Sequence, residues 1–323
     1  MPPPTFDEKS TAAEVVSAFA DHIRGKNVLV TGTSINGIGF EAARAIARHC
    51  NLLIITGYNS ERLKLSEEAI KKEFPTANVR QLNLDLASQA SVRAAAAQVS
   101  SYPEPLHVLI HNAAAGLTSP YTITVDGLEL QMATAHINPF LFTKLLAPKL
   151  LAAGTPDFTP RVVFVSSAAH VWGSPLEVQT LGRPDPAKFT PGEGYAWSKQ
   201  AMVLAAIELS KRSQGRVNAY SLHPGAIYTN VQQREGRTEY FKEIGILNAE
   251  GLPNEDKFPW KTIPQGAATT AVAAFDTRLD DTPGAYLWDC VEANSKVAPN
   301  ITAENAEKLW TATEDILGEK FQF

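Results

Sequence analysis

The chain has few cysteines, no long hydrophobic run and no block of basic residues, and each absence removes a class of protein. Cys50 and Cys290 are the only cysteines among 323 residues, which excludes a disulfide framework. No paired Cys/His spacing suits a structural zinc ion. The sequence therefore predicts no metal and a reducing, cytoplasmic location.

The charge and the first residues exclude two kinds of partner. A formal net charge of −5, without clustered Lys and Arg, leaves no electrostatic footprint for nucleic acid. Residues 1–25 carry acids and no unbroken apolar core, so we predict neither a signal peptide nor a membrane anchor there. The apolar spacing of Val15, Phe19 and Ile23 predicts instead a helical extension that packs on the body before the first strand.

Short apolar runs alternate with helical patterns along the chain. The helical patterns include Phe40–His49, Glu61–Phe74 and Ser91–Val99. This alternation predicts an α/β fold: a single Rossmann-type, doubly wound domain over residues 1–323, with a seven-stranded, mainly parallel sheet and helices on both faces. The predicted strands are Asn27–Val30, Leu52–Ile55, Val79–Leu82, His107–Ile110, Arg161–Val165, Val217–Leu222 and Ala285–Leu287.

Two stretches, at about 170–194 and about 230–264, are too short to separate domains and are rich in apolar and aromatic residues. Both follow predicted strands at their carboxyl ends, where doubly wound sheets bind ligands. We predict that they are lids over a mostly apolar substrate pocket. Packing of the lids on the body accounts for a share of the same residues, because pockets and cores use the same residue types.

A glycine-rich turn follows the first predicted strand directly. It runs from Thr31 to Gly39 as TGTSINGIG and leads straight into a helical pattern. Glycines let a backbone turn tightly and approach a pyrophosphate, and the free N–H groups of a helix start favour its negative charge. A turn of this kind is also found with a purely structural role, so its context has to support a nucleotide site.

Tyr195 and Lys199 lie four residues apart in a helix that we expect to open after Gly192 and Gly194. That spacing sets both side chains on one helical face. A neighbouring ammonium lowers the pKa of a phenol, ordinarily about 10, toward neutral pH. The pair is therefore a candidate for general acid–base catalysis, and an exposed helical pair is the alternative.

The motifs and their order resemble those of the short-chain dehydrogenase/reductase family. The turn is similar to the family fingerprint TGxxxGxG, with one extra residue between Gly32 and Gly37. HNAA after the fourth predicted strand, a serine pair after the fifth and PGAIYT after the sixth follow in the same order. Later segments at 265–269 and 284–287 are similar to the retinol-dehydrogenase-like and WW-domain-oxidoreductase-like branch, especially its fungal members.

The resemblance implies a site. It assigns Ser167 to the substrate oxygen, Tyr195 to proton donation, and Lys199 to both the ribose and the tyrosine. It implies NADP as cofactor, with NAD as the alternative, because Tyr58 stands where NAD-preferring relatives carry an acid. The implied cofactor contacts are Gly32, Ser34, Asn36, Gly37, Ile38, Tyr58, Asp85, Leu86, Asn112, Ala113, Tyr195, Lys199, Pro224, Gly225, Ile227 and Thr229.

The chain departs from the family pattern at one predicted helix. Ala135 stands where relatives often carry an asparagine of a proton relay, and Asn138 stands where they carry glycine. We predict that Asn138, three residues on and on the same helical face, restores part of the water site and joins the catalytic residues. Capping of a turn before Pro139 is the alternative.

The sequence predicts an NAD(P)(H)-dependent oxidoreductase, preferring NADP, that acts on CH–OH groups. Its substrate would be a small apolar ketone or aldehyde, reduced, or a secondary alcohol, oxidised. We expect a monomer or a dimer, because the long passage before Tyr195 would obstruct the helix pairing of many relatives. Ala135 leaves two alternatives open: a low-turnover nucleotide-binding regulator, and a non-redox biosynthetic tailoring enzyme on the same fold.

Overall fold

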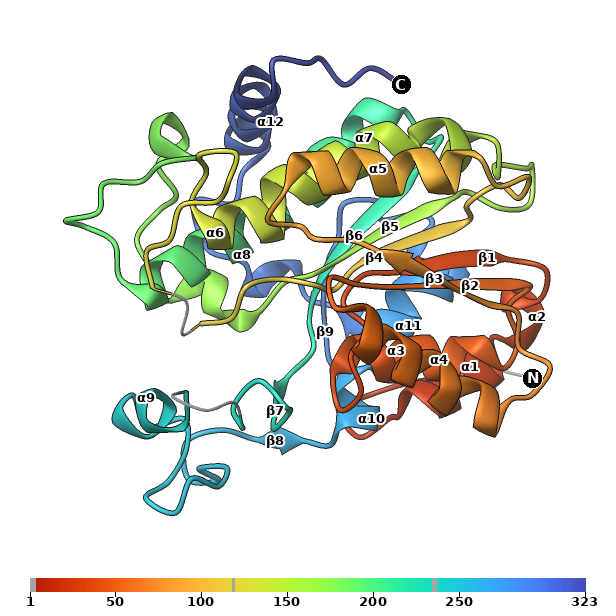
Figure 1. Ribbon diagram of the computed structural model, residues 1–323, viewed down its shortest axis with the longest axis horizontal. Helices are drawn as coiled ribbons and strands as arrows, with labels where there is room; N and C mark the ends of the chain where they lie inside the picture. Colours follow the sequence, from red (N-terminus) through yellow and green to blue (C-terminus); the bar gives the residue numbers. More distant parts are fainter. Residues whose placement is uncertain (1–3, 118–119, 234–236) are drawn as a thin grey trace.

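The centre of the molecule is an eight-stranded sheet with helices on both of its faces (Figure 1). The computed structural model describes residues 4–117, 120–233 and 237–323. Residues 1–3 of the predicted N-terminal extension and 234–236 of the predicted second lid lie outside the described residues. The predicted α/β class and doubly wound sheet are confirmed.

The sheet has the strand order β10-β9-β6-β5-β4-β1-β2-β3. All neighbouring pairs are parallel except β9 and β10. The strand order reverses between β1 and β4, and ligands bind beyond the carboxyl ends of the strands at such a reversal. The strands are β1 Asn27–Val30, β2 Leu52–Gly57, β3 Val79–Asn83, β4 Val108–His111, β5 Arg161–Val165, β6 Asn218–His223, β9 Tyr286–Trp288 and β10 Val291–Glu292.

All seven predicted strands form, but the predicted count is one too low. The additional strand, β10, has two residues and closes a hairpin with β9. A run of two residues has no periodicity by which a sequence could reveal it. A separate parallel ribbon pairs β7 (Ala226–Ile227) with β8 (Trp260–Lys261). With α9 it stands to one side of the body in Figure 1 and carries the second predicted lid.

Two apolar layers fill the space between the sheet and its helices. Val28 and Val30 of β1 pack in one layer and Leu29 packs in the other, because successive strand residues point to opposite faces. Helices α1, α3 and α11 cover the first face, and α5 and α7 cover the second (Figure 1). The helices are α1 Ala12–Ala18, α2 Ala20–Ile23, α3 Ile38–Ala47, α4 Ser60–Glu73, α5 Gln89–Ser100, α6 Leu130–Met132, α7 Asn138–Leu151, α8 Pro191–Ser213, α9 Thr238–Glu243, α10 Ile263–Gly266, α11 Ala268–Phe275 and α12 Ala303–Leu317.

The predicted N-terminal helical extension forms as two short helices, α1 and α2. Thr11 and Glu14 make a reciprocal capping box at the start of α1, which satisfies free N–H groups of the first turn. Val15, Phe19 and Ile23 are buried in the first apolar layer. The extension therefore packs on the body before β1, as its apolar spacing predicts.

Helix α8 begins earlier than the sequence predicts. It starts at Pro191, so Gly192 and Gly194 lie inside the helix rather than before it. The Thr190 side chain caps the helix by accepting from the Glu193 N–H, and proline at the first helical position suits the helix start. Glycine is required at position 194, because a Cβ there would lie 2.3 Å from the Phe189 ring. The cap decided this boundary against the low helix propensity of glycine.

Candidate active site

Three predicted catalytic residues meet where β5 ends and α8 begins. Ser167 follows β5 closely, and its hydroxyl accepts a hydrogen bond from the Ala169 N–H at 3.1 Å. The Ser167 hydroxyl lies near enough to the Tyr195 phenol to lower its pKa. Lys199 Nζ lies 5.3 Å from the centroid of the Tyr195 ring. The chain thus brings a hydroxyl, a phenol and an amine together at the carboxyl edge of the sheet.

The Lys199 amine is held in the interior. Its side chain comes from the third turn of α8, the residue is 4% exposed, and Nζ donates to the Val165 carbonyl at 3.0 Å. Burial lowers the pKa of Lys199 from 10.5 to about 7. The amine therefore changes charge near neutral pH, the range in which a proton carrier is useful.

The depressed pKa of Lys199 predicts a pH-dependent stability. Between about pH 7 and about pH 10.5 the unfolded chain keeps a proton on Lys199 that the folded chain has lost, so the free energy of unfolding rises with pH in this range. Lys199→Met removes the buried charge. We expect the free energy of unfolding of this variant to exceed that of the parent most below pH 7. Urea unfolding of the cofactor-free protein across this range measures the effect. Lys188→Met, at an exposed lysine, is the control and should leave the slope unchanged.

The pKa of the Tyr195 phenol differs from the one that the sequence predicts. Burial raises the pKa of Tyr195, and the nearby Ser167 hydroxyl opposes that rise only in part. The predicted lowering of the phenol pKa is wrong for the protein without cofactor. The reason is burial of the phenol itself, because removal from water disfavours the charged phenolate.

The glycine turn between β1 and α3 has no room for side chains at two positions. Gly32 has a φ of +73°, and a Cβ there would lie 2.7 Å from the Ala113 Cβ. A Cβ at Gly39 would lie 2.2 Å from Asn112 Nδ2 and 2.6 Å from the Gly32 carbonyl oxygen. The turn is therefore packed directly on the segment after β4, and α3 starts with its N–H groups at this edge.

Asn112 and Ala113, which the resemblance assigned to the cofactor, hold the glycine turn in place. Asn112 Nδ2 donates to the carbonyls of Thr31 and Gly32 at 3.0 and 3.1 Å. The N–H groups of Asn112 and Ala113 both donate to Thr31 Oγ1 at 3.0 Å. Gly39 and Thr31 were missed as site residues. The signal for Gly39 was present, because the last glycine of such a motif serves close packing between helix and strand.

The inserted part of the turn bulges away from the sheet. Thr33 is fixed by its N–H and hydroxyl, which both donate to the Thr56 carbonyl at 3.0 and 3.2 Å. Beyond it, Ser34 is half-buried and Asn36 is exposed with a φ of +62°. Gly37 precedes α3 as its cap residue, and Ile38 is the first helical residue. The bulge thus begins from an anchored residue and returns directly to the helix start.

The predicted adenine side is open to solvent. Tyr58, directly after β2, is 63% exposed, which leaves its ring free to stack. Asp85 is exposed, and its carboxylate accepts from the Ala87 N–H at 2.9 Å. Leu86 is buried, and its carbonyl accepts from Asn138 Nδ2 at 2.7 Å. No acidic side chain of the β2–α4 turn replaces the one found in NAD-preferring folds, because Tyr58 and Asn59 occupy it.

The predicted nicotinamide side follows β6. Pro224 precedes Gly225, which has a φ of +104° that a residue with a side chain rarely adopts. Ile227 lies buried in β7, and Thr229 is buried just after it. The Lys261 side chain of β8 packs against Gly225, so the β7–β8 ribbon fixes this turn from outside.

The helix that carries Ala135 is bent in spite of the missing asparagine. Residues Ala133–Ile137 form a π-helical turn between α6 and α7. Asn138 closes the π-helical turn with its N–H and is the first residue of α7, and its side-chain amide donates to the Leu86 carbonyl rather than within the turn. The residue is fully buried, and its Oδ1 has no partner among the residues that the structure describes. A buried amide oxygen without a partner is a place where a water molecule is held in proteins.

Apolar side chains of the second predicted lid cover the candidate catalytic residues. Leu117, Phe241 and Leu247 form a buried cluster, and the rings of Tyr195 and Tyr228 pack against it. Phe241 lies in α9 and Leu247 in the segment that leads to β8. The surroundings of the Tyr195 phenol are therefore apolar on the lid side.

The first predicted lid divides into a packed part and an exposed part. Leu176 and Leu181 pack with the α8 residues Ala201 and Leu204 on the body. Trp172, by contrast, is 55% exposed. Leu176 and Leu181 are therefore core residues, and Trp172, close to Ser167 in sequence, is free to contact a substrate.

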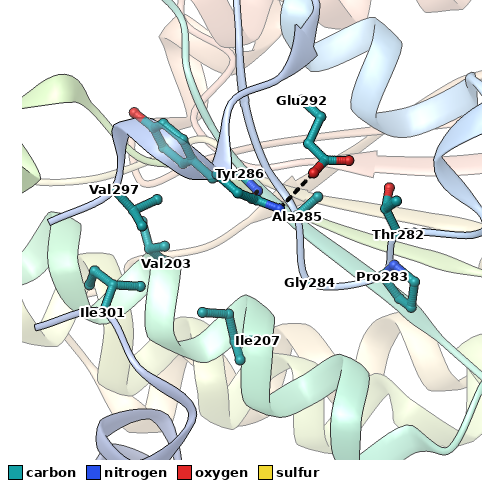
Figure 2. A pocket seen from close by; sticks show the side chains of 11 residues that line it. Val203, Ile207, Thr282, Pro283, Gly284, Ala285, Tyr286, Glu292, Val297 and Ile301 are labelled. Carbon is teal, nitrogen blue, oxygen red and sulfur yellow. Dashed lines mark hydrogen bonds between the residues drawn. The ribbon is translucent and has the colours of Figure 1, made fainter. Parts of the chain in front are cut away.

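A cavity of about 450 Å³ lies away from these residues. Figure 2 shows it between Val203 and Ile207 of α8, the β9–β10 hairpin, and Val297 and Ile301. None of the predicted site residues lines it, so it is not the substrate pocket. Among residues 4–117, 120–233 and 237–323, no cluster of His, Cys, Asp and Glu could hold a metal ion. No helix in the same ranges is long and apolar enough to span a membrane.

Comparison with known proteins identifies the family. A family model described as short chain dehydrogenase matches residues 26–179. Short-chain dehydrogenase TIC 32 A, chloroplastic, of Brassica napus is 34% identical over 311 residues, 94% of this chain and 92% of that protein. Short-chain dehydrogenase/reductase prx1 of Penicillium roqueforti is 33% identical, over 94% of this chain and 89% of that protein. The WW domain-containing oxidoreductase of Gallus gallus is 31% identical, over 98% and 74%. The chain belongs to the short-chain dehydrogenase/reductase family, as its motifs predict.

Solved structures share the fold. The NADPH-bound carbonyl reductase from chicken fatty liver superposes with a TM-score of 0.58 at 21% identity, over 82% of this chain and 96% of that one. A short-chain type dehydrogenase/reductase from Mycobacterium marinum gives a TM-score of 0.63 at 16% identity, over 88% and 100%. At such identities the likeness concerns the fold.

Proposed function

We propose that the protein is an NADP(H)-preferring oxidoreductase that reduces an apolar ketone or aldehyde, or oxidises a secondary alcohol, through Ser167, Tyr195 and Lys199. The observation that carries the proposal is the convergence of these three side chains beneath an apolar lid. Ser167 and Tyr195 donate hydrogen bonds to the carbonyl oxygen, where negative charge develops. Tyr195 then transfers its proton to that oxygen, and Lys199 supplies the neighbouring positive charge.

The glycine turn and the start of α3 would hold the diphosphate of the cofactor, which supplies the hydride when bound. The absence of space for a Cβ at Gly32 and Gly39 supports this assignment. Glycines at these positions let the turn and the start of α3 pack closely together, and a backbone without side chains can approach a diphosphate. Thr229 and Ile227 would bind the nicotinamide end. NADP is favoured because Tyr58, rather than a carboxylate, stands where the second ribose phosphate would lie.

The burial of Lys199 favours the proposed proton transfer from Tyr195 to the carbonyl oxygen. A buried amine with a pKa of about 7 accepts a proton readily from solvent and gains charge when a phenolate forms beside it. Water is excluded from the lid side by Leu117, Phe241 and Leu247. An apolar wall of this kind strengthens the electrostatic contacts at the carbonyl oxygen and favours substrates with an apolar body.

Asn138 is our proposed partner for the relay water that returns a proton to Lys199. Its Nδ2 is fixed by the Leu86 carbonyl, which leaves the unpartnered Oδ1 to accept from a water molecule. We expect Asn138→Ala to lower the rate of a proton-limited substrate and Ala135→Asn to raise it. Steady-state rates in light and heavy water measure the effect, and parental values for both variants contradict the relay.

The proposed domain organisation, oligomeric state and location of the protein follow from its packing and its thiols. We propose a single domain with two lids, because α8 carries catalytic residues at one end and core residues along its length. Helix α12 packs along α8, which supports a monomer or a dimer that leaves this face unpaired. The free thiols of Cys50 and Cys290 are compatible with the predicted cytoplasmic location.

A hydride-transfer assay tests the function directly. We expect oxidation of NADPH with a panel of apolar aldehydes and ketones, slower oxidation of NADH, and little turnover with polar sugars. Nucleotide binding without turnover across the panel contradicts the proposal and favours the low-turnover regulator that Ala135 suggests. Consumption of a substrate without a change of cofactor redox state favours the non-redox enzyme instead.

A further inference from the structure

The extra residue of the glycine turn makes a contact with a distant part of the chain. Asn230 Nδ2 donates to the Ile35 carbonyl at 2.8 Å. The Asn230 N–H donates to the Asn36 carbonyl at 3.4 Å. The turn after β1 is therefore bonded to the segment after β7, although about 195 residues separate them in sequence.

The left-handed backbone at Asn36 aims the two carbonyls at Asn230. Asn36 has a φ of +62°, a conformation that asparagine tolerates better than other residues with side chains. The preceding Thr33 is anchored to Thr56, so the inserted residues can project only outward from the sheet. Without the extra residue the turn would be one residue shorter. The hydrogen bonds to Asn230 therefore depend on the turn length by which this chain departs from the family spacing.

Asn230 is presented by a segment that its own hydrogen bonds make rigid. The Thr229 N–H and hydroxyl both donate to Gln232 Oε1 at 3.0 Å. Gln232 Nε2 donates back to the Ile227 carbonyl at 3.1 Å. The N–H of Val231 donates to Thr229 Oγ1 at 3.2 Å. The segment thus holds Asn230 in position without help from a ligand.

We propose that the two hydrogen bonds between Asn230 and the Ile35–Asn36 backbone form a clasp across the cofactor groove. The inference rests on the proposed function, in which the glycine turn binds the diphosphate and Thr229 binds near the nicotinamide. The clasp joins the two segments that lie on either side of the groove. A bound dinucleotide must pass it, so the clasp sets the rate at which cofactor enters and leaves. Asn36 and Asn230 are positioning residues, and neither takes part in hydride transfer.

Stopped-flow fluorescence of NADPH, with NADPH as the probe, tests the clasp on the full chain. Asn230→Ala removes the shorter bond, and we expect association and dissociation rates both to rise about fivefold, the factor that one net hydrogen bond supplies. The equilibrium Kd should change little, because opening the clasp speeds both directions. In the cofactor-free protein, amide hydrogen exchange over residues 34–37 should become faster.

Two substitutions at Asn36 separate backbone conformation from side-chain contact. Asn36→Gly keeps a positive φ accessible, and because both Asn36 variants lose the same side chain, its association and dissociation rates should be slower than those of Asn36→Val. Asn36→Val disfavours that conformation and should reproduce the faster rates of Asn230→Ala. Thermal unfolding of each variant verifies that the fold is retained.

The outcomes separate this inference from the proposed function. Normal NADPH binding with unchanged rates in Asn230→Ala overturns the clasp alone. A weaker Kd with an unchanged association rate also overturns it, because Asn230 would then be an ordinary ligand contact. A parent chain that binds neither NADPH nor NADH overturns the clasp and the proposed function together.

Discussion

Tyr195→Phe should lower kcat/KM for every carbonyl substrate by on the order of 100- to 10,000-fold, the contribution of general acid catalysis. The substitution removes one hydroxyl and keeps the ring that packs against Leu117, Phe241 and Leu247. The polar group that the substitution takes away is the hydroxyl beside Ser167. Folding and NADPH affinity should therefore stay near the parental values while turnover falls.

Steady-state kinetics and fluorescence titration with NADPH measure this effect side by side. Tyr228→Phe is a matched control: the Tyr228 ring packs on the same apolar cluster, and its hydroxyl donates to the Gly251 carbonyl within the lid. We expect this control to turn over within a few-fold of the parent. A Tyr195→Phe variant that keeps most of its activity would falsify the assignment of Tyr195 as the proton donor.

Gly39→Val should weaken NADPH binding about 10- to 100-fold, because overpacking costs about 1–3 kcal/mol at such a position. A Cβ at residue 39 meets Asn112 Nδ2 at 2.2 Å and the Gly32 carbonyl oxygen at 2.6 Å. The carbonyl belongs to the backbone and cannot rotate away. The first turn of α3 must then move off the glycine turn, and its N–H groups lose their aim at the diphosphate.

Gly154→Ala is the control for this second prediction. Gly154 lies outside the glycine turn, and a Cβ there meets the Leu151 carbonyl oxygen at 3.4 Å and the Pro160 ring at 3.7 Å, which are ordinary contacts. We expect calorimetry to give this variant nearly parental NADPH affinity, with Gly39→Val far weaker and its melting temperature a few degrees lower, since overpacking also strains the fold. Equal affinities in the two variants would contradict the close packing of α3 on the turn as the cause.

The sequence could predict most of the candidate site because its motifs are local. Tyr195 and Lys199 belong to one helix, and their spacing sets their relative position wherever the helix lies. The glycine turn adjoins its own strand and helix for the same reason. The strands were found by their apolar runs, and the two-residue β10 was missed because its pairing with β9 comes from the hairpin rather than from periodicity.

Other features depended on the environment of each side chain. The pKa of Lys199 is set by burial beneath β5, which no spacing records. The same is true of Asn112, whose amide is used to hold the Thr31 and Gly32 carbonyls instead of standing free. The apolar lid residues could not be divided by type into pocket and core, because Leu176 and Leu247 differ only in what they contact.

By itself the sequence determined the α/β class, the order of the motifs and the choice of candidate catalytic side chains, because these follow from local periodicity and from short spacings along one element. Only the tertiary structure decided that Gly39 has no space for a Cβ, that Asn138 has an unpartnered buried oxygen, and that Asn230 reaches Asn36. Each of these facts depends on residues far apart in the chain, and a long-range distance is fixed by the packing of whole elements rather than by any pattern within one of them.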